Sequence, residues 1–468
     1  MDCSKTFTTD WLASDPVFYN EITGVISDDI NNVIDWNNAE LHPEGLINFL
    51  NYGYSVFEQT PVKGVRFLRH SAVAKSVNNK IVVDYRDDLT IKAIDAVTHE
   101  DDVLHLLNNR INEWAGNTTG EIIIPVSGGL DSRLLAFLLK DKKRIRMFTY
   151  GISNNQEDSF EVVKARKLAE ILGVRWQFIP LGHFHRYFDT WDKLYGIATH
   201  AHGMYHLEFY KNILPLVSGN NPFISGIIGD AWAGSLQFGD INTIDDIKKL
   251  AITHGMNANS AACKLKSENL ITQDFFQKHK FLLQNEKYKV VASMRMKILL
   301  LSYLIRVPRY YGFQPWSPFL EPDVALAMLN LPPERRKDRI WQRDFFDRNH
   351  LNIEKLNLNF AWENSLNMQG ILNIRPQHLN ADVLSEIFDV NYIKSINSAL
   401  SPENHMQKIL LRLLNVWGTR GLLYRMGLRN NSFQKPAEKV LEAYFAYLTI
   451  KPVENFLVKR NNFAKAKK

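Results

Sequence analysis

Cysteine and long apolar runs are scarce in this chain of 468 residues. Its two cysteines, Cys3 and Cys263, lie far apart in the sequence, so they indicate neither a disulfide framework nor a cysteine zinc site and are typical of a reducing cytoplasm. No apolar run approaches the roughly 18 residues that a membrane-spanning helix needs. The first residues also lack the apolar segment of a secretory signal. We therefore expect a cytoplasmic protein without a membrane partner.

An excess of charge of one sign is also lacking. Lysine and arginine number 56 against 50 aspartate and glutamate residues, a net charge of +6. Part of this excess lies in residues 459–468, which are typical of a solvated terminus, and no recognised nucleic-acid-binding motif accompanies them. We therefore do not expect a nucleic-acid partner.

The periodicity of apolar residues predicts an α/β fold in two parts. Short apolar runs indicate strands, and apolar residues spaced three and four apart indicate helices. Strands are predicted at 65–75, 80–85, 122–126, 144–150, 174–180 and from residue 222, and helices at 41–50, 99–114, 158–172 and, with a break near Gly203, 188–216. The alternation after residue 96 predicts a parallel sheet with helices on both faces and a helical C-terminal part. Residues 1–95 are expected to form a small β-containing region, and 96–468 the main domain.

One stretch in the main domain predicts a ligand site. The strand at 122–126 is followed by Ser127-Gly128-Gly129-Leu130-Asp131-Ser132, which opens a helix. The glycines allow a tight turn and a close approach of the backbone to a ligand. The free amides of a helix start favour an anion. Two serine hydroxyls add donors, and Asp131 could hold a divalent cation. We expect a polyphosphate site, although an ordinary strand–loop–helix turn is the simpler alternative.

This stretch resembles the PP-loop of the ATP pyrophosphatase superfamily, whose fold is called adenine nucleotide alpha hydrolase-like. Among its members the chain is most similar to the asparagine synthetase-like ligases. Four further stretches carry the resemblance, at residues 148–174, 224–234, 318–321 and 46–68. By this resemblance, residues 1–95 are a degenerate glutaminase remnant and 96–468 an ATP-binding ligase domain.

The resemblance implies a ligase that uses ATP and Mg²⁺. It adenylates a small-molecule carboxylate, releases pyrophosphate and transfers the acyl group to ammonia or an amine, with ammonia free or supplied by a separate glutaminase. The implied phosphate ligands are Ser127, Gly128, Gly129 and Ser132, the implied adenosine ligands are Val126, Tyr150, Ser225 and Gly226, and the implied magnesium ligands are Asp131 and Asp230. The family also uses a catalytic lysine against the phosphates. Lys355, and less closely Lys337, is a candidate for it, although a solvated lysine is the simpler interpretation of either.

Departures from the family pattern limit what the resemblance implies. The glutaminase nucleophile is a cysteine directly after the initiator Met, but here Asp2 precedes Cys3, so Cys3 is expected to be inert. Ile227 and Ala231 stand where the family has acidic residues. Gln314, Trp316 and Glu321 replace other polar residues of the family and predict a changed acceptor pocket or a loss of activity.

Two questions stay open from the sequence. His200, His202 and His206 could bind zinc, but substrate contacts or core packing are the simpler interpretations. Two other functions also fit a PP-loop: a tRNA-modifying enzyme, or a non-catalytic nucleotide-binding relative.

Overall fold

A parallel sheet forms the centre of the computed structural model, which describes residues 6–218, 220–251, 256–401 and 434–466. Its strands lie in the order β11 (Gln314–Trp316), β10 (Pro222–Ile224), β7 (Ile122–Pro125), β8 (Ile145–Thr149) and β9 (Arg175–Phe178). All neighbouring pairs are parallel, which confirms the predicted α/β class. The chain proceeds from β7 to β9 in one direction and then returns to the other side of β7. The sheet therefore has a topological switch point between β7 and β10, where ligands bind in folds of this type.

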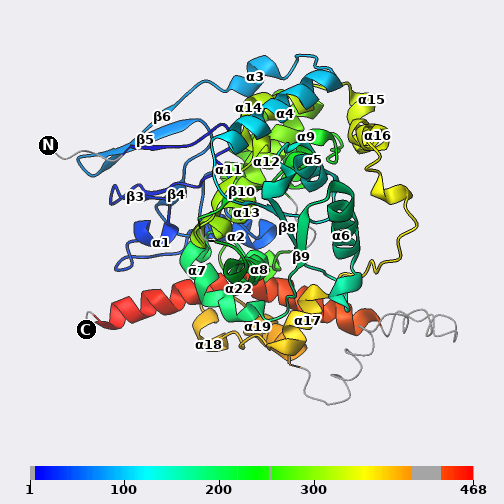
Figure 1. Ribbon diagram of the computed structural model, residues 1–468. Coiled ribbons are helices and arrows are strands. Elements are labelled where there is room, and N and C mark those ends of the chain that lie inside the picture. The colour runs from blue at the N-terminus through cyan, green and yellow to red at the C-terminus, as the bar shows by residue number, and fades with distance from the viewer. Residues whose placement is uncertain (1–5, 219, 252–255, 402–433, 467–468) are drawn as a thin grey trace.

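Helices cover both faces of this sheet (Figure 1). Successive side chains of a strand point to opposite faces. In β7, Ile123 packs into one buried cluster, whereas Ile122 and Ile124 pack into another. One cluster includes residues of α2 (Pro43–Tyr52), α7 (Phe188–Tyr195), α8 (Tyr205–Ile213), α17 (Leu366–Asn373), α19 (Val390–Ala399) and α22 (Gln434–Ala466). The other includes residues of α4 (Glu100–Gly116), α5 (Leu130–Leu138), α6 (Phe160–Leu172), α12 (Glu286–Leu301), α14 (Pro322–Leu329) and α16 (Ile340–Arg348).

The N-terminal region contains two small antiparallel sheets. One has the order β1 (Thr6–Thr8), β5 (Ala72–Val77), β6 (Lys80–Tyr85), and the other has the order β3 (Ile26–Ser27), β2 (Phe18–Asn20), β4 (Val65–Phe67). The prediction of one strand over 65–75 is wrong, because the chain crosses from one sheet to the other at residues 68–71 and Ser71 has a φ of 56°. The turn at Asn78 and Asn79 is confirmed, and both residues have positive φ, as tight hairpins require.

The helical segment predicted over 188–216 is interrupted more widely than expected. It forms α7 and α8, with short 3₁₀ turns between them. Gly203 lies in this connection, and a Cβ added there would come within 2.5 Å of the Trp191 ring. The close approach of the backbone to Trp191 therefore explains the glycine. None of the helices in the described ranges is both long and apolar enough to cross a membrane.

The N-terminal region shares its core with the main domain. Phe18 and Phe49 belong to the same buried cluster as Phe148 of β8. Asp88 also pairs with Arg295 of α12, with Oδ2 at 2.6 Å from Nη1 and Oδ1 at 2.8 Å from Nη2. Since only 14% and 9% of these side chains are exposed, the pair is largely shielded from water.

Removal of the Asp88 carboxylate tests how firmly the N-terminal region is joined to α12. We expect Asp88→Ala to lower the free energy of unfolding by about 3 kcal/mol, because it leaves a poorly solvated guanidinium without its partner. Asp87→Ala is the matched control, since Asp87 is 95% exposed and its ion pair among the described residues is with the exposed Lys92. Urea unfolding of both variants would contradict this account if their stabilities were equal.

Candidate functional site

A cavity of about 720 Å³ opens at the switch point of the sheet. Loops after β7 and β10, far apart in the sequence, form one wall together. The predicted ligand residues that line it are Val126, Ser127, Gly129, Asp131, Ser132, Tyr150, Ser225, Gly226 and Asp230. Gly128 is not on the wall itself. It has a φ of 69°, and a Cβ added there would lie 2.9 Å from Lys164 Cβ, so the backbone of the loop packs directly on α6.

The loop after β7 presents hydrogen-bond donors that have no partner. Gly129 is the N-cap of α5 and provides no side-chain cap, so the first amides of the helix stay free of side-chain acceptors. The Ser132 side chain lies in the first turn, and its buried hydroxyl has no hydrogen-bond partner in the described structure. Free amides, a helix dipole and an unpartnered hydroxyl together suit an anion.

Two carboxylates line the cavity, one from this loop and one from the loop after β10. Asp131 pairs with the Arg339 guanidinium and lies 3.5 Å from Gln342 Nε2, whereas Asp230 accepts a hydrogen bond of 2.9 Å from Ser235 Oγ. Burial raises the pKa of Asp131 to about 6; the charge of Arg339 lowers it and that of Asp230 raises it again. The negative charge at Asp131 is therefore incompletely compensated, and a cation near both carboxylates would be stabilised.

The two carboxylates suit magnesium better than a metal ion whose ligands all come from the protein. Among the residues that the structure describes, no three His, Cys, Asp or Glu side chains are grouped so that they could hold a metal ion. Mg²⁺ commonly takes one or two carboxylates and completes its shell with water and substrate phosphates. Asp131 and Asp230 match that pattern if a polyphosphate binds beside them.

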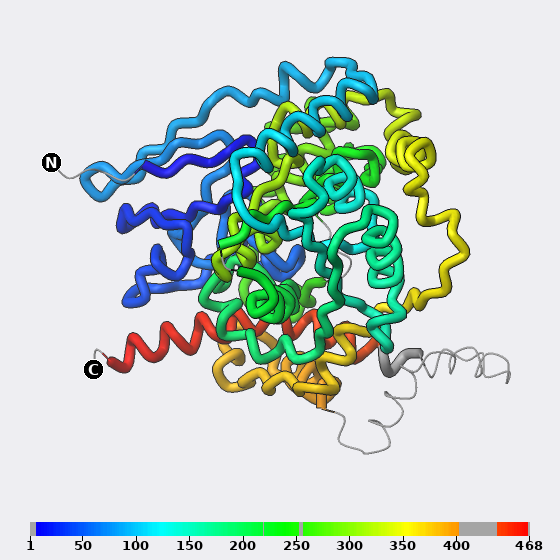
Figure 2. The backbone as a smooth tube through the Cα atoms, in the orientation of Figure 1, coloured from blue at the N-terminus to red at the C-terminus, as the bar shows by residue number. Residues whose placement is uncertain are grey.

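An ion pair between buried Arg133 and the partly exposed Glu354 holds the loop in place, and no sequence pattern predicts it. Arg133, which is fully buried, donates to both carboxylate oxygens of Glu354 at 2.8 Å and to the Gly128 carbonyl oxygen at 3.1 Å. Lys164 adds a contact of 3.2 Å to the same carboxylate. Glu354 lies between α16 and α17 in a segment, yellow in Figure 2, that runs along the outside of the molecule past α6.

The predicted catalytic lysine does not reach the cavity. Lys355 pairs with Asp347, with Nζ at 2.9 Å from Oδ1, and 69% of its side chain is exposed. Lys337 is also exposed and does not line the cavity. The described cations that line it are instead Arg339, which begins α16, and Lys297 of α12, whose pKa is lowered by burial although the charge of Asp230 opposes the shift.

The opposite half of the cavity is lined by aromatic rings and imidazoles. His200, His202 and His206 all face it, and each has a buried ring nitrogen without a hydrogen-bond partner. Burial lowers the pKa of His202 to about 4 and that of His206 to about 3, so both are neutral at pH 7. Tyr205 and Tyr303 lie against His206, with ring centroids 4.5 and 4.9 Å away. These uncharged groups are available to the polar atoms of a bound molecule rather than grouped as zinc ligands.

The departures from the family pattern fall in two places. Ile227 lines the cavity and is 2% exposed, and Ala231 lines it as well. Gln314, Trp316 and Glu321 do not line it. Trp316 instead stacks on Trp114 of α4, at 4.9 Å and 14° between ring planes, and donates to Glu321 Oε1 at 3.1 Å. Trp316 and Glu321 therefore contribute to the packing against α4, whereas Gln314 is an exposed residue of β11.

Ile228, in the loop after β10, has a backbone conformation that the sequence did not reveal. Its φ is 54°, in the left-handed region that a β-branched residue rarely adopts, although its side chain is only 5% exposed. Such strain is concentrated at functional sites.

Cys3 lies outside the described residues.

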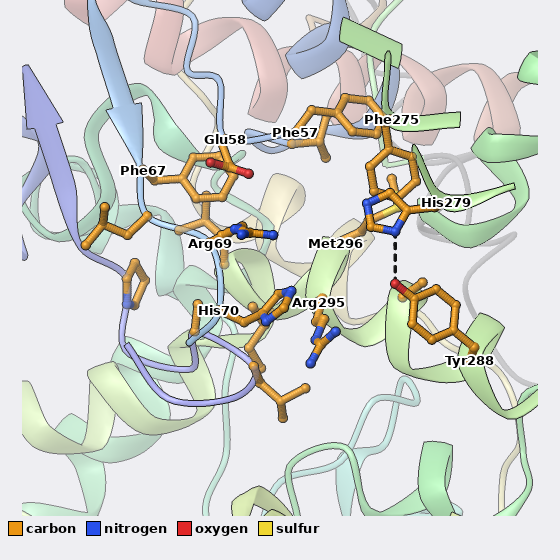
Figure 3. A pocket seen from close by; sticks show the side chains of 18 residues that line it. Phe57, Glu58, Phe67, Arg69, His70, Phe275, His279, Tyr288, Arg295 and Met296 are labelled. Carbon is orange, nitrogen blue, oxygen red and sulfur yellow. Dashed lines mark hydrogen bonds between the residues drawn. The ribbon is translucent and has the colours of Figure 1, made fainter. Parts of the chain in front are cut away.

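A second, smaller cavity of about 110 Å³ lies between the N-terminal region and helices α11 (Leu270–His279) and α12 (Figure 3). Its walls are mainly aromatic and aliphatic, and His279 Nδ1 lies 2.9 Å from the Tyr288 hydroxyl. None of the predicted ligand residues lines it. Helix α12 contributes side chains to both cavities and separates them.

Comparison with known proteins adds no relative. No protein-family model matches the chain, and no curated protein sequence matches it.

The Glu354 carboxylate predicts a pH-dependent stability. Burial opposes its ionisation, but the hydrogen bonds and charge of Arg133 outweigh burial and lower its pKa from 4.5 to about 2. A folded-state pKa below the unfolded value stabilises the fold above pH 4.5, and this contribution is lost as the pH falls toward 2. We expect Glu354→Gln to lower the free energy of unfolding at pH 7 by about 2–3 kcal/mol.

The difference from the unsubstituted protein should shrink as urea unfolding is repeated at pH 5, 4 and 3. Glu334→Gln, at an exposed position, should change stability little at any of these values. A constant difference between Glu354→Gln and the unsubstituted protein would show that the pair with Arg133 does not stabilise the fold through charge.

Proposed function

We propose that the chain is an ATP-dependent, amide-forming ligase of the asparagine synthetase-like type, with a PP-loop fold. It adenylates a small carboxylic acid, releases pyrophosphate and transfers the acyl group to ammonia or an amine. The observation that carries the proposal is the convergence of Ser127, Asp131 and Ser132 with Asp230 at one cavity of the switch point. The motif alone suggested phosphate binding, and this convergence supports a phosphate site completed by a metal.

The residues on the phosphate side have complementary roles in this reaction. Free amides of the loop and the Ser132 hydroxyl hold the β- and γ-phosphates through hydrogen bonds. Asp131 and Asp230 would hold magnesium, which would neutralise the charge that develops on the leaving pyrophosphate. The acid's carboxylate oxygen bonds to the α-phosphorus as the bond to the bridging oxygen breaks.

Arg339 links the metal site to the phosphates. Its guanidinium pairs with the Asp131 carboxylate. A cation at Asp131 would compete with that pair, and the released guanidinium, which lines the cavity, would be free to bind a phosphate. In this proposal Arg339 takes the role that the sequence assigned to Lys355.

The imidazole half of the cavity suits the remainder of the acid. A free amino acid would need ionised partners for its ammonium and carboxylate groups. His202 and His206 are neutral and have unpartnered ring nitrogens. They favour an acid whose distal part is uncharged and rich in hydrogen-bonding groups.

The amine enters last in the proposed sequence. Its nitrogen attacks the carbonyl carbon of the acyl-adenylate, the bond to AMP breaks, and the nitrogen loses a proton. Ile227 is apolar where the asparagine synthetase-like ligases have an acid, so this wall does not attract a charged ammonium ion. The proposed donor is ammonia, from solution or from a separate glutaminase, or a larger amine. The proposed location of the reaction is the cytoplasm.

Product analysis tests this proposal. The protein is incubated with ATP, magnesium, ammonium ions and a panel of carboxylic acids that includes hydroxy acids and amino acids, and the phosphorus NMR spectrum is recorded. We expect AMP and pyrophosphate, and a loss of at least about 100-fold in rate for Asp131→Asn, since metal and phosphate contacts supply several kcal/mol.

Asp101→Asn, which alters an exposed carboxylate of α4, is the matched control and should keep full activity. Formation of ADP and phosphate would contradict the adenylating chemistry. Nucleotide binding without turnover of any acid would favour a non-catalytic protein instead.

A further inference from the structure

Glu161 is a buried acid on the cavity wall that the reaction described above does not use. It lies in the first turn of α6, lines the cavity and is only 7% exposed. Its Oε2 atom has no hydrogen-bond partner, and no ion pair with Glu161 is found among the described residues. Lys164, one turn further along α6, is engaged with Glu354 instead. An unpartnered carboxylate oxygen is costly to bury, so a ligand group that bonds to it would stabilise it.

The position of Glu161 relates it to the phosphate loop and to Tyr150. A Cβ added at Gly128 would lie 3.4 Å from Glu161 Cα, so the first turn of α6 rests on the glycine of the loop. Burial raises the pKa of the Tyr150 hydroxyl, and the negative charge of Glu161 contributes to that shift. Glu161 is therefore near both the loop proposed to hold phosphates and the tyrosine proposed to contact adenosine.

Charge decides which part of a nucleotide Glu161 can contact. A carboxylate beside a phosphate would repel it, and the phosphates already have amide and hydroxyl donors from the loop. Glu161 also does not join Asp131 and Asp230 in a group of three that could hold a metal. Two neutral parts of the nucleotide carry hydrogen-bond donors, the ribose diol and the adenine amino group. The ribose joins the phosphates to the base, and Glu161 is likewise near both the phosphate loop and Tyr150, so its position matches the diol. In other doubly wound sheets an acid after the second strand binds the ribose in this way.

We infer that Glu161 binds the ribose hydroxyls of the nucleotide and thereby selects ribonucleotides over deoxyribonucleotides. The inference rests on the proposed function, because it takes ATP as the ligand of the cavity. It adds a binding residue outside the motif of residues 127–132 and a selectivity for the ribose that this motif does not predict. Glu161 acts here as a binding residue, with no part in the transfer of the acyl group.

The test is calorimetric titration with magnesium–ATP and magnesium–2′-deoxy-ATP, in the absence of any acid substrate. The unsubstituted protein should bind ATP about tenfold more tightly than 2′-deoxy-ATP, because a hydrogen bond to a buried carboxyl group is lost with the hydroxyl. Glu161→Ala should weaken ATP binding more than 2′-deoxy-ATP binding, until the two affinities are about equal. A merely structural role would weaken both nucleotides alike.

Two further variants complete the experiment. Glu161→Gln keeps the shape of the side chain and should give an intermediate ratio of ATP to 2′-deoxy-ATP affinity. This variant still tests the assignment if the alanine variant fails to fold. Glu170→Gln alters an exposed acid on the same helix and should keep the full ratio. Equal affinities in the unsubstituted protein, or an unchanged ratio in both Glu161 variants, overturn the assignment alone. Failure of the unsubstituted protein to bind either nucleotide overturns the proposed function, and the assignment with it.

Discussion

The ion pair between the fully buried Arg133 and Glu354 is the interaction on which the site depends. Arg133 is part of α5, whose first turn supplies the loop, yet its side chain points away from the cavity and is fully buried. Its planar guanidinium donates to two carboxylate oxygens and to the Gly128 and Leu351 carbonyl oxygens. Only arginine presents donors in such a fork. A charge removed so completely from water must keep its partner, and this requirement fixes the glycine loop against a segment more than 200 residues later in the chain.

The order of strands then explains why distant residues meet. β7 lies in the middle of the sheet, with β8 and β10 as its neighbours. The carboxyl ends of these parallel strands share one edge, so the loops that follow them converge there. Asp131 and Asp230 owe their proximity to this topology, because nothing in their sequence separation predicts it. Helix α12 closes the same cavity from the other side and brings Lys297 to it.

Sequence reasoning was most successful where the signal is local. The apolar runs of β7 and β8 and the glycine loop were found at nearly the observed positions, because burial on both faces leaves a continuous apolar stretch. The interrupted strand at 65–75 was missed because two sheets share one apolar stretch. Lys355 was chosen by its place in the sequence, whereas Arg339 and Glu161 reach the cavity through tertiary contacts that a sequence pattern cannot show. Ile228 was missed because backbone strain leaves no mark on residue type.

The central claim is that this cavity holds a polyphosphate above the loop after β7. A crystal structure with magnesium and a non-hydrolysable ATP analogue, such as α,β-methylene-ATP, tests it most directly. The account predicts β- and γ-phosphates over Gly129 and Ser132, with a metal ion between Asp131 and Asp230. A nucleotide bound elsewhere, or phosphates directed away from this loop, would contradict it.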